Sequence, residues 1–297
     1  MKRFLALAGI AIAIGAQAQI ATVSAPEALL QDVRGELYNP ILSADGTKLL
    51  YSASDFSNLR MYDFNVGESS LICDEAGAGY GAQFAGNTVV YIAQKVNDNG
   101  LIMRQLRKYD IGAGANANLT APARFIERPY IDGTAMNTAI DGKRRSIGKS
   151  AAKAVRTEGS TLYITTNGVE RAYSPVASEA GYLWESFSPD GQKVMFFAAG
   201  KGIVITDLNG NVLATPGNFE NPQWYGNDYI VAQNSTDDGH QYSSSQIVLV
   251  SLDGKQRQDL TTPESMTMNP AASVAAQKVV YNTIDGRMYQ MTVKLNK

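Results

Sequence analysis

Short apolar runs alternate with polar turns along most of the chain, and one such unit recurs. Residues 39–53 read NPILSADGTKLLYSA, and residues 185–199 read ESFSPDGQKVMFFAA. Asp-Gly between two extended runs favours a β-hairpin, because glycine accepts positive φ and aspartate tolerates it. The run that follows is apolar on both faces, which is typical of a strand buried between neighbouring sheets.

Three further stretches follow the same plan of an apolar strand, a third strand and a polar turn: 80–109, 221–254 and 268–293. The stretch from 121 to 176 lacks the Asp-Gly hairpin at the expected place. It does contain Asn167-Gly168 between two short apolar segments, which indicates a two-residue hairpin. We therefore count 121–176 as one degenerate unit, the sixth.

Six units over residues 19–297 give a repeat of about 46 residues, close to the ~40–50 of a propeller blade. The sequence thus predicts an all-β protein, a six-bladed β-propeller over 36–297, with five or seven blades as alternatives. The last unit reaches only three strands before Lys297. We expect residues 20–24, within the N-terminal segment 19–35, to supply its outer strand and close the ring.

The first 18 residues have the pattern of a signal peptide. Lys2 and Arg3 precede an apolar run over 4–14, and Ala16-Gln17-Ala18 follows as a small-x-small site. This predicts cleavage between Ala18 and Gln19 and a periplasmic or secreted protein. The alternative is an N-terminal anchor helix, but the run is shorter than the ~20 residues of a membrane span. No later segment is apolar enough to span a bilayer, so we expect no transmembrane segment in the mature chain.

Composition removes several classes of function. The 297 residues carry a formal net charge of −2 and no long basic tract, so nucleic-acid binding is not expected. One cysteine, Cys73, cannot form an internal disulfide, and we expect it to be a small buried side chain. One histidine and one cysteine do not make a His/Cys metal cluster, so we expect neither a metal nor a cofactor.

The pattern Pro-x-x-Ser-x-Asp-Gly, followed by an Asp-Leu-x-Gly-type turn, resembles the WD40-like repeat of TolB-type propellers. Residues 40–51 and 186–196 carry the resemblance best, and 221–228 and 269–281 carry it more weakly. The resemblance implies a propeller fold over most of 36–295 in an exported bacterial protein. Only about 17 residues separate the signal from the first blade, so we expect no counterpart of the separate N-terminal domain of TolB. Such blades occur in proteins of many roles, so the resemblance implies little about activity.

Catalytic motifs are scarce. His240 is the one histidine, no Gly-x-Ser-x-Gly elbow occurs, and the polar segment 234–240 is expected to be a solvated loop. Gly148-Lys149-Ser150 is not a phosphate loop, because Lys143 stands where the first glycine is required. Spacing along the sequence does not reveal whether two carboxylates meet in space. An enzyme acting on a glycan or small molecule through channel carboxylates therefore stays as an alternative.

Two groups of residues are candidates for binding. Aromatic side chains lie near the starts of units, and those exposed together would form a binding surface: Tyr80, Tyr130, Tyr182, Trp184 and Trp224. A basic run is expected to be a solvated loop, with a docking patch for an acidic partner as the alternative: Lys143, Arg144, Arg145 and Lys149. We therefore expect a non-enzymatic module that binds a protein or peptide of the cell envelope.

Overall fold

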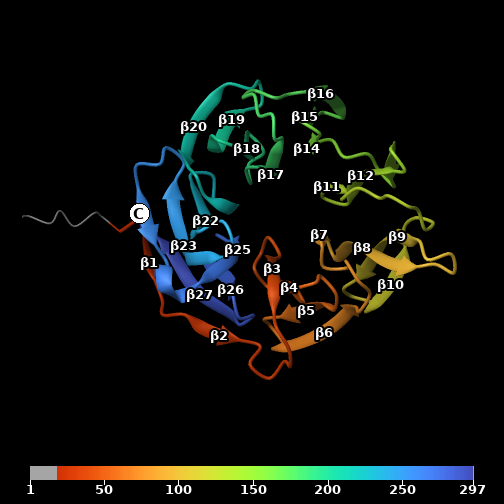
Figure 1. Cartoon of the computed structure of the whole chain (residues 1–297), viewed down its shortest axis with the longest axis horizontal. Coiled ribbons are helices and arrows are strands. Elements are labelled where there is room, and N and C mark those ends of the chain that lie inside the picture. The colour runs from red at the N-terminus through yellow and green to blue at the C-terminus, as the bar shows by residue number, and fades with distance from the viewer. Residues whose placement is uncertain (1–18, 297) are drawn as a thin grey trace, which may run out of the picture.

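The computed structural model describes residues 19–296, which form seven antiparallel sheets arranged as blades around a central axis (Figure 1). The predicted signal peptide, residues 1–18, lies outside the described residues. Blade 1 contains β3 (Tyr38–Leu42), β4 (Lys48–Ser52), β5 (Leu59–Asp63) and β6 (Glu68–Cys73). Blade 2 contains β7 (Gln83–Ala85), β8 (Thr88–Val96), β9 (Ile102–Asp110) and β10 (Ala115–Asn118).

The stretch expected to be one degenerate blade is two blades of three strands each. Blade 3 contains β11 (Tyr130–Asp132), β12 (Ala135–Ile140) and β13 (Lys143–Ile147). Blade 4 contains β14 (Ala154–Glu158), β15 (Thr161–Thr166) and β16 (Val169–Ala172). The prediction of six blades was therefore wrong, and the described residues form seven. Because each of these blades omits its fourth strand, the two together are only slightly longer than one complete blade.

The basic run is also corrected by the structure. Lys143, Arg144 and Arg145 do not lie in a loop; they form β13, which pairs with β12 through Arg144–Ala139 and its neighbours. The turn between these strands is Asp141-Gly142, in which both residues have positive φ, 48° and 75°. Lys149 follows the strand, and its carbonyl accepts the backbone N–H of Met136 at 3.1 Å.

The remaining three blades are complete. Blade 5 contains β17 (Tyr182–Phe187), β18 (Lys193–Ala198), β19 (Gly202–Asp207) and β20 (Val212–Gly217). Blade 6 contains β21 (Glu220–Tyr225), β22 (Tyr229–Asp237), β23 (Tyr242–Ser251) and β24 (Arg257–Asp259). A short 3-10 turn, Pro263–Ser265, leads to β25 (Thr267–Ser273), β26 (Lys278–Thr283) and β27 (Met288–Leu295) of blade 7.

The two ends of the described chain meet in blade 7. Its outer strand is β1 (Ala21–Val23), which pairs antiparallel with β27 through Ala21–Leu295. Farther along, β2 (Glu27–Leu29) pairs with the same strand. Ile20 and Ala21 are buried in the hydrophobic cluster that blades 6 and 7 share. Gln258 of β24 also bonds to both backbone groups of Ala21, at 2.9 Å each, so β1 ties blade 7 to blade 6.

The recurring Ser-x-Asp-Gly motif is a hydrogen-bonded turn. Ser188 Oγ donates to Asp190 Oδ1 at 2.5 Å, and the backbone N–H of Lys193 donates to Ser188 Oγ at 2.9 Å. Ser43, Asp45 and Lys48 repeat this arrangement in blade 1. These serine hydroxyls lower the pKa of both Asp45 and Asp190 below the usual range, because each stabilises the charged carboxylate. The motif therefore fixes hairpins rather than a reactive site.

The second and third strands supply most of the packing between blades. Phe196 of β18 and Ile164 of β15, for example, are fully buried in one cluster between blades 4 and 5. Cys73 is buried too, at 7% exposure, and burial raises the pKa of its thiol. Over residues 19–296, no helix is long and apolar enough to cross a membrane.

Candidate functional site

The innermost strands share an irregularity that faces the central channel. Asn39, Trp184, Asn221 and Asn269 each have a positive φ between 47° and 56°. At each of them the register between the innermost strand and its neighbour shifts, which marks a β-bulge. Asparagine tolerates this left-handed backbone better than most residues do. The bulge redirects the side chain and backbone of the inner strand.

Blades 2 and 3 have related irregularities at the same level. In blade 3 the bridge Ile126–Ile140 and the pair Tyr130–Asn137 differ in register by one residue, which places a bulge at Arg128-Pro129. In blade 2 the bridge Ala76–Gln94 and the pair Gln83–Val90 differ by three residues. That insertion holds Gly79-Tyr80-Gly81. Arg128 and Gly81, each two residues before a paired residue of the inner strand, thus occupy the positions that asparagine takes in blades 1, 6 and 7.

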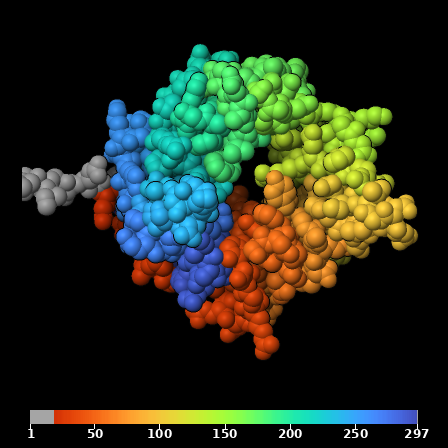
Figure 2. Space-filling view, viewed as in Figure 1, coloured from red at the N-terminus to blue at the C-terminus, as the bar shows by residue number. Residues whose placement is uncertain are grey.

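These irregular segments, except that of blade 5, line a single pocket of about 320 Å³. The ring is hollowed at its centre (Figure 2), and the pocket draws on the channel-facing strands of five blades. We call it the channel pocket. Its polar and aromatic lining residues are Asn39, Asn221, Gln223, Asn269, Arg128, Phe56 and Tyr80. Arg128 is the one charged side chain among the lining residues, all of which lie within the described range.

Side-chain amides connect one wall of the channel pocket. Asn221 Nδ2 donates to Asn269 Oδ1 at 3.0 Å, and Asn269 Nδ2 donates to Asn282 Oδ1 at 3.2 Å. Gln233 Oε1 accepts the backbone N–H of Asn269 at 3.1 Å. Asn282 and Gln233 are buried, so these bonds hold the bulge of blade 7 against both its own second strand and blade 6. The wall is therefore held together by hydrogen bonds within the protein itself.

The opposite wall is aromatic and cationic. Tyr80 is 64% exposed and packs edge to face against Phe56, with ring centroids 5.2 Å apart. A side chain at Gly81 would meet the methylenes of Arg128, so the glycine gives the arginine room to lie against blade 2. The guanidinium of Arg128 and the ring of Tyr80 consequently line the same pocket.

The structure does not bring the five candidate aromatic residues together. Tyr80 alone of them lines the channel pocket. Tyr182 is 4% exposed, packs against Phe196 and donates its hydroxyl to the carbonyl of Val176, so it is a core residue and not a surface one. Trp184 packs against Phe197, and Trp224 donates its indole N–H to Ser186 Oγ at 3.1 Å.

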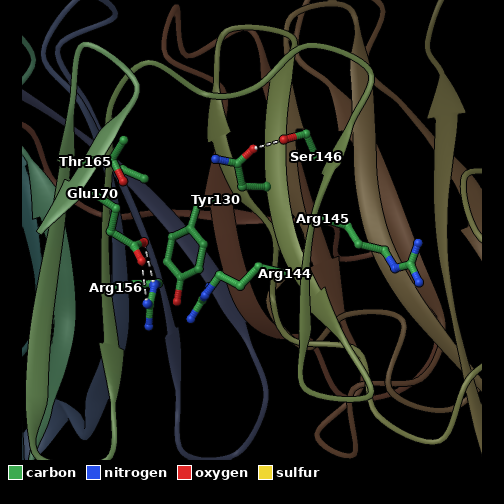
Figure 3. Close-up of a pocket in the computed structure, with 9 residues that line it drawn as sticks. Tyr130, Arg144, Arg145, Ser146, Arg156, Thr165 and Glu170 are labelled. Atoms are coloured by element: carbon green, nitrogen blue, oxygen red, sulfur yellow. Dashed lines mark hydrogen bonds and ion pairs between the residues drawn. The ribbon is translucent and has the colours of Figure 1, made fainter.

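Tyr130 belongs to a second pocket, of about 170 Å³, between blades 3 and 4. Arg156 is 4% exposed there and forms two hydrogen bonds with Glu170 at 2.8 and 2.9 Å (Figure 3). Its guanidinium also lies 4.0 Å from the centroid of the Tyr163 ring. Arg144 pairs with Glu158 at 3.0 Å. Hydrogen bonds from Arg156 lower the pKa of both glutamates. These charges neutralise one another, so the cluster joins the two short blades and is not a free anion site.

Two glutamates lie on inner strands without lining the channel pocket. Burial raises the pKa of Glu185, whose Oε1 accepts the backbone N–H of Thr157 at 3.2 Å. Glu220 accepts hydrogen bonds from Gln233 and Ser235 at 2.9 Å each. Among residues 19–296, no group of three His, Cys, Asp or Glu side chains is placed to hold a metal ion. His240 is exposed in the turn between β22 and β23, but the segment 234–240 is not a loop throughout, because residues 234–237 form the end of β22 and pair with β23.

No protein-family model matches the sequence, and no curated protein matches it. Among solved structures, TolB from Acinetobacter baumannii superposes with a TM-score of 0.51 at 18% identity, over 79% of this chain. The β-propeller domain of Myceliophteria thermophila Cps50 (Swd1) superposes with a TM-score of 0.57 at 10% identity, over 92% of this chain and 100% of that one. The chain has the fold of TolB and of a WD40 β-propeller domain. It spans 56% of the TolB chain.

The predicted resemblance to TolB-type, WD40-like propellers is thus confirmed for the fold. Sequence reasoning missed the bulges that shape the channel pocket of this TolB-like propeller. A signal was present, because Asn-Pro occurs at 39–40, 221–222 and 269–270, and Arg128-Pro129 holds the matching place. Proline cannot donate a ladder hydrogen bond, so its repeated place near the start of an inner strand marks a bulge there.

Proposed function

We propose that the chain is a non-enzymatic binding module that takes a segment of a protein or peptide in the channel pocket. The proposal rests on the lining of the channel pocket. Bulged inner strands and the segments beside them line it with amide groups, one guanidinium and one exposed aromatic ring. Amides match the donors and acceptors of a peptide backbone. The guanidinium of Arg128 matches a carboxylate, and tyrosine contributes large contact area at small entropic cost.

The occupant we propose is an extended peptide that carries a carboxylate. The asparagine wall is already held by Asn282 and Gln233, so little ordering is needed when a ligand binds. We further propose a periplasmic or secreted location and a partner in the cell envelope. The signal-peptide pattern of residues 1–18 supports this location.

The rival hypothesis is an enzyme that acts on a glycan or a small molecule. Glycoside chemistry needs two carboxylates about 5–10 Å apart that face an open pocket. Within the described residues, the channel pocket is lined by no carboxylate. The lining therefore favours binding over this chemistry.

A peptide-display library panned on the protein tests the proposal. Recovered peptides are measured by fluorescence polarisation against the unaltered protein, Arg128→Ala and Tyr80→Ala. The control is Lys201→Ala, at an exposed residue in the turn between β18 and β19 that does not line the pocket. We expect peptides that contain a carboxylate, bound at least about tenfold more weakly by both pocket variants and unchanged by the control. Peptides that bind all four proteins equally, or a library that yields none, would contradict the proposal.

A further inference from the structure

The outer rim of blade 3 presents an open strand edge. β13 is the outermost strand of this blade, and within residues 19–296 only β12 pairs with it. Lys143, Arg144, Arg145 and Ser146 are all exposed. In an antiparallel pair, alternate residues direct their backbone N–H and C=O groups away from the neighbouring strand. β13 therefore offers solvent a row of backbone groups that can pair with a further strand.

Blade 4 also lacks a fourth strand, but its edge is tied to blade 5. Arg171 of β16 donates to the carbonyl of Leu208, and its guanidinium lies 5.2 Å from the centroid of Tyr173. Glu170 of the same strand is engaged by Arg156. Both outer positions are open to a further strand. Blade 3 is distinguished by Lys143 and Arg145, which form neither an ion pair nor a side-chain hydrogen bond within residues 19–296.

The side chains of β13 divide between the two faces of the sheet. Arg144 points toward blade 4 and pairs with Glu158 and Glu127 at 3.0 and 3.6 Å. Arg145 points the other way (Figure 3), and Lys143 shares its face because successive side chains alternate. In the described part of the chain, Lys143, Arg145 and Lys149 take part in no ion pair. One face of the open edge thus carries positive charges that no acidic side chain of the described residues neutralises in an ion pair.

Blade 7 shows that this ring accepts an outer strand from elsewhere in the sequence. β1 completes that blade although it lies more than two hundred residues before β27, and the pairing is antiparallel. The strand needs only three paired residues there, with side-chain bonds from Gln258. The vacant outer position of blade 3 differs mainly in that nothing in residues 19–296 fills it.

We propose that blade 3 binds an extended acidic segment of a partner protein as its fourth strand, antiparallel to β13. Acidic side chains at alternate positions of that segment face Lys143 and Arg145, since directly opposed residues of paired strands share one face. Backbone hydrogen bonds supply affinity, and the charges select the partner. A second copy of this chain is a poor occupant, because β13 against β13 would oppose like charges. This rim site shares no residue with the channel pocket, so the two proposals stand independently.

Fluorescence polarisation with a defined peptide tests the rim site. The probe is a labelled peptide of about ten residues, alternating Glu with Val and Thr and blocked at both ends. We expect saturable binding that weakens at least about tenfold in Lys143→Glu/Arg145→Glu. The control is Lys201→Glu/Lys255→Glu, which makes the same change in net charge at exposed lysines elsewhere and should bind like the unaltered protein. Equal weakening in both variants would show that only overall charge matters and would overturn the proposal.

Backbone-methylated probes separate strand pairing from plain charge attraction, and they use the unaltered protein. Two further peptides carry N-methyl groups on alternate amides, one in each register. Only one set of amides faces β13 in an antiparallel pair, so one methylated peptide should lose binding and the other should keep it. Equal binding of both methylated peptides, or no saturable binding of the parent peptide, would overturn the proposal. The second outcome would leave the basic strand as a charged edge that prevents aggregation.

Discussion

Asn221 donates its side-chain amide to Asn269 Oδ1 at 3.0 Å, across the boundary between blades 6 and 7. Both residues occupy the bulge of an innermost strand and have positive φ, 47° and 52°. Equivalent positions of two repeats therefore contact each other directly at the channel. Because Asn269 also bonds to buried Asn282, the network extends from the pocket into the interior of blade 7.

The bulge of blade 7 should be sensitive to both backbone strain and lost hydrogen bonds. Asn269→Ala removes bonds to Asn221 and Asn282 and places alanine in a left-handed conformation, so we expect a loss of about 2–4 kcal/mol in the free energy of unfolding. Asn269→Gly loses the same bonds without the strain and should cost about 1 kcal/mol less. Urea unfolding of both variants measures the difference. Equal costs would mean that the backbone conformation is not strained.

If β1 closes the ring, substitutions at two adjacent residues of this strand should differ in their effect on the free energy of unfolding. Ala21 is fully buried in the cluster of blades 6 and 7, whereas Thr22 is exposed. We expect Ala21→Glu to lower the free energy of unfolding by about 3 kcal/mol or more, because it buries an unpaired charge. Thr22→Glu in the same strand should change it by less than about 0.5 kcal/mol. Thermal melts of the two variants test this prediction. The same melting temperature for both would contradict closure of the ring by this strand.

Two turn glycines allow the cost of backbone strain to be measured separately from the cost of steric crowding. Gly46 and Gly100 have nearly the same φ, 68° and 73°. A Cβ at Gly46 would collide with Ala276 and Ser273 of blade 7, whereas nothing lies near Gly100. Gly100→Ala should cost about 1–2 kcal/mol from the left-handed backbone alone. Gly46→Ala should lower the free energy of unfolding, measured with urea, clearly more than Gly100→Ala does. An equal loss would show that blades 1 and 7 move apart easily at this contact.

The buried carboxyl of Glu185 predicts a pH dependence. Burial raises its pKa, so the folded state holds this proton more tightly than the unfolded chain does. Its contribution to stability is then greatest below the unfolded pKa of about 4.3 and declines as pH rises through the folded pKa. Glu185→Gln removes the charge. As the pH rises through the folded pKa, the free energy of unfolding of this variant should therefore increase relative to that of the unaltered protein. Urea unfolding from pH 4 to 7 tests this, with exposed Glu179→Gln as the control; a difference independent of pH would contradict it.

The repeat was predictable where each blade keeps its hydrogen-bonded turn. Ser43-Ala44-Asp45-Gly46 and Ser188-Pro189-Asp190-Gly191 identified blades 1 and 5, and their hydroxyl–carboxylate bonds explain the spacing. Blades 3 and 4 were merged because each has only three strands, so that both together have about the length expected of one blade. Asp132-Gly133 and Asp141-Gly142 were nonetheless visible, and both turn glycines have positive φ.

The candidate site was less predictable than the fold. Tyr80 was identified from its place at the start of a blade, and the structure puts it in the channel pocket. Tyr182 occupies a similar place in the sequence but is buried, because its ring packs on Phe196. The lining of the channel pocket comes together from five blades, and the pattern along one strand does not encode which blades meet. The predicted loop at Lys143 failed for a simpler reason: charged residues are ordinary on an edge strand.

The pairing of β1 with β27 also sets an order of events during synthesis. Synthesis proceeds from the N-terminus, so β1 is made more than two hundred residues before β27, the strand with which it pairs. Blades 1 to 6 can form in turn, but the circle stays open until the final strand appears. Until then Ile20 and Ala21 remain in water, together with the surface of blade 6 that they later cover. The pairing with β27 therefore completes β1 as well as blade 7.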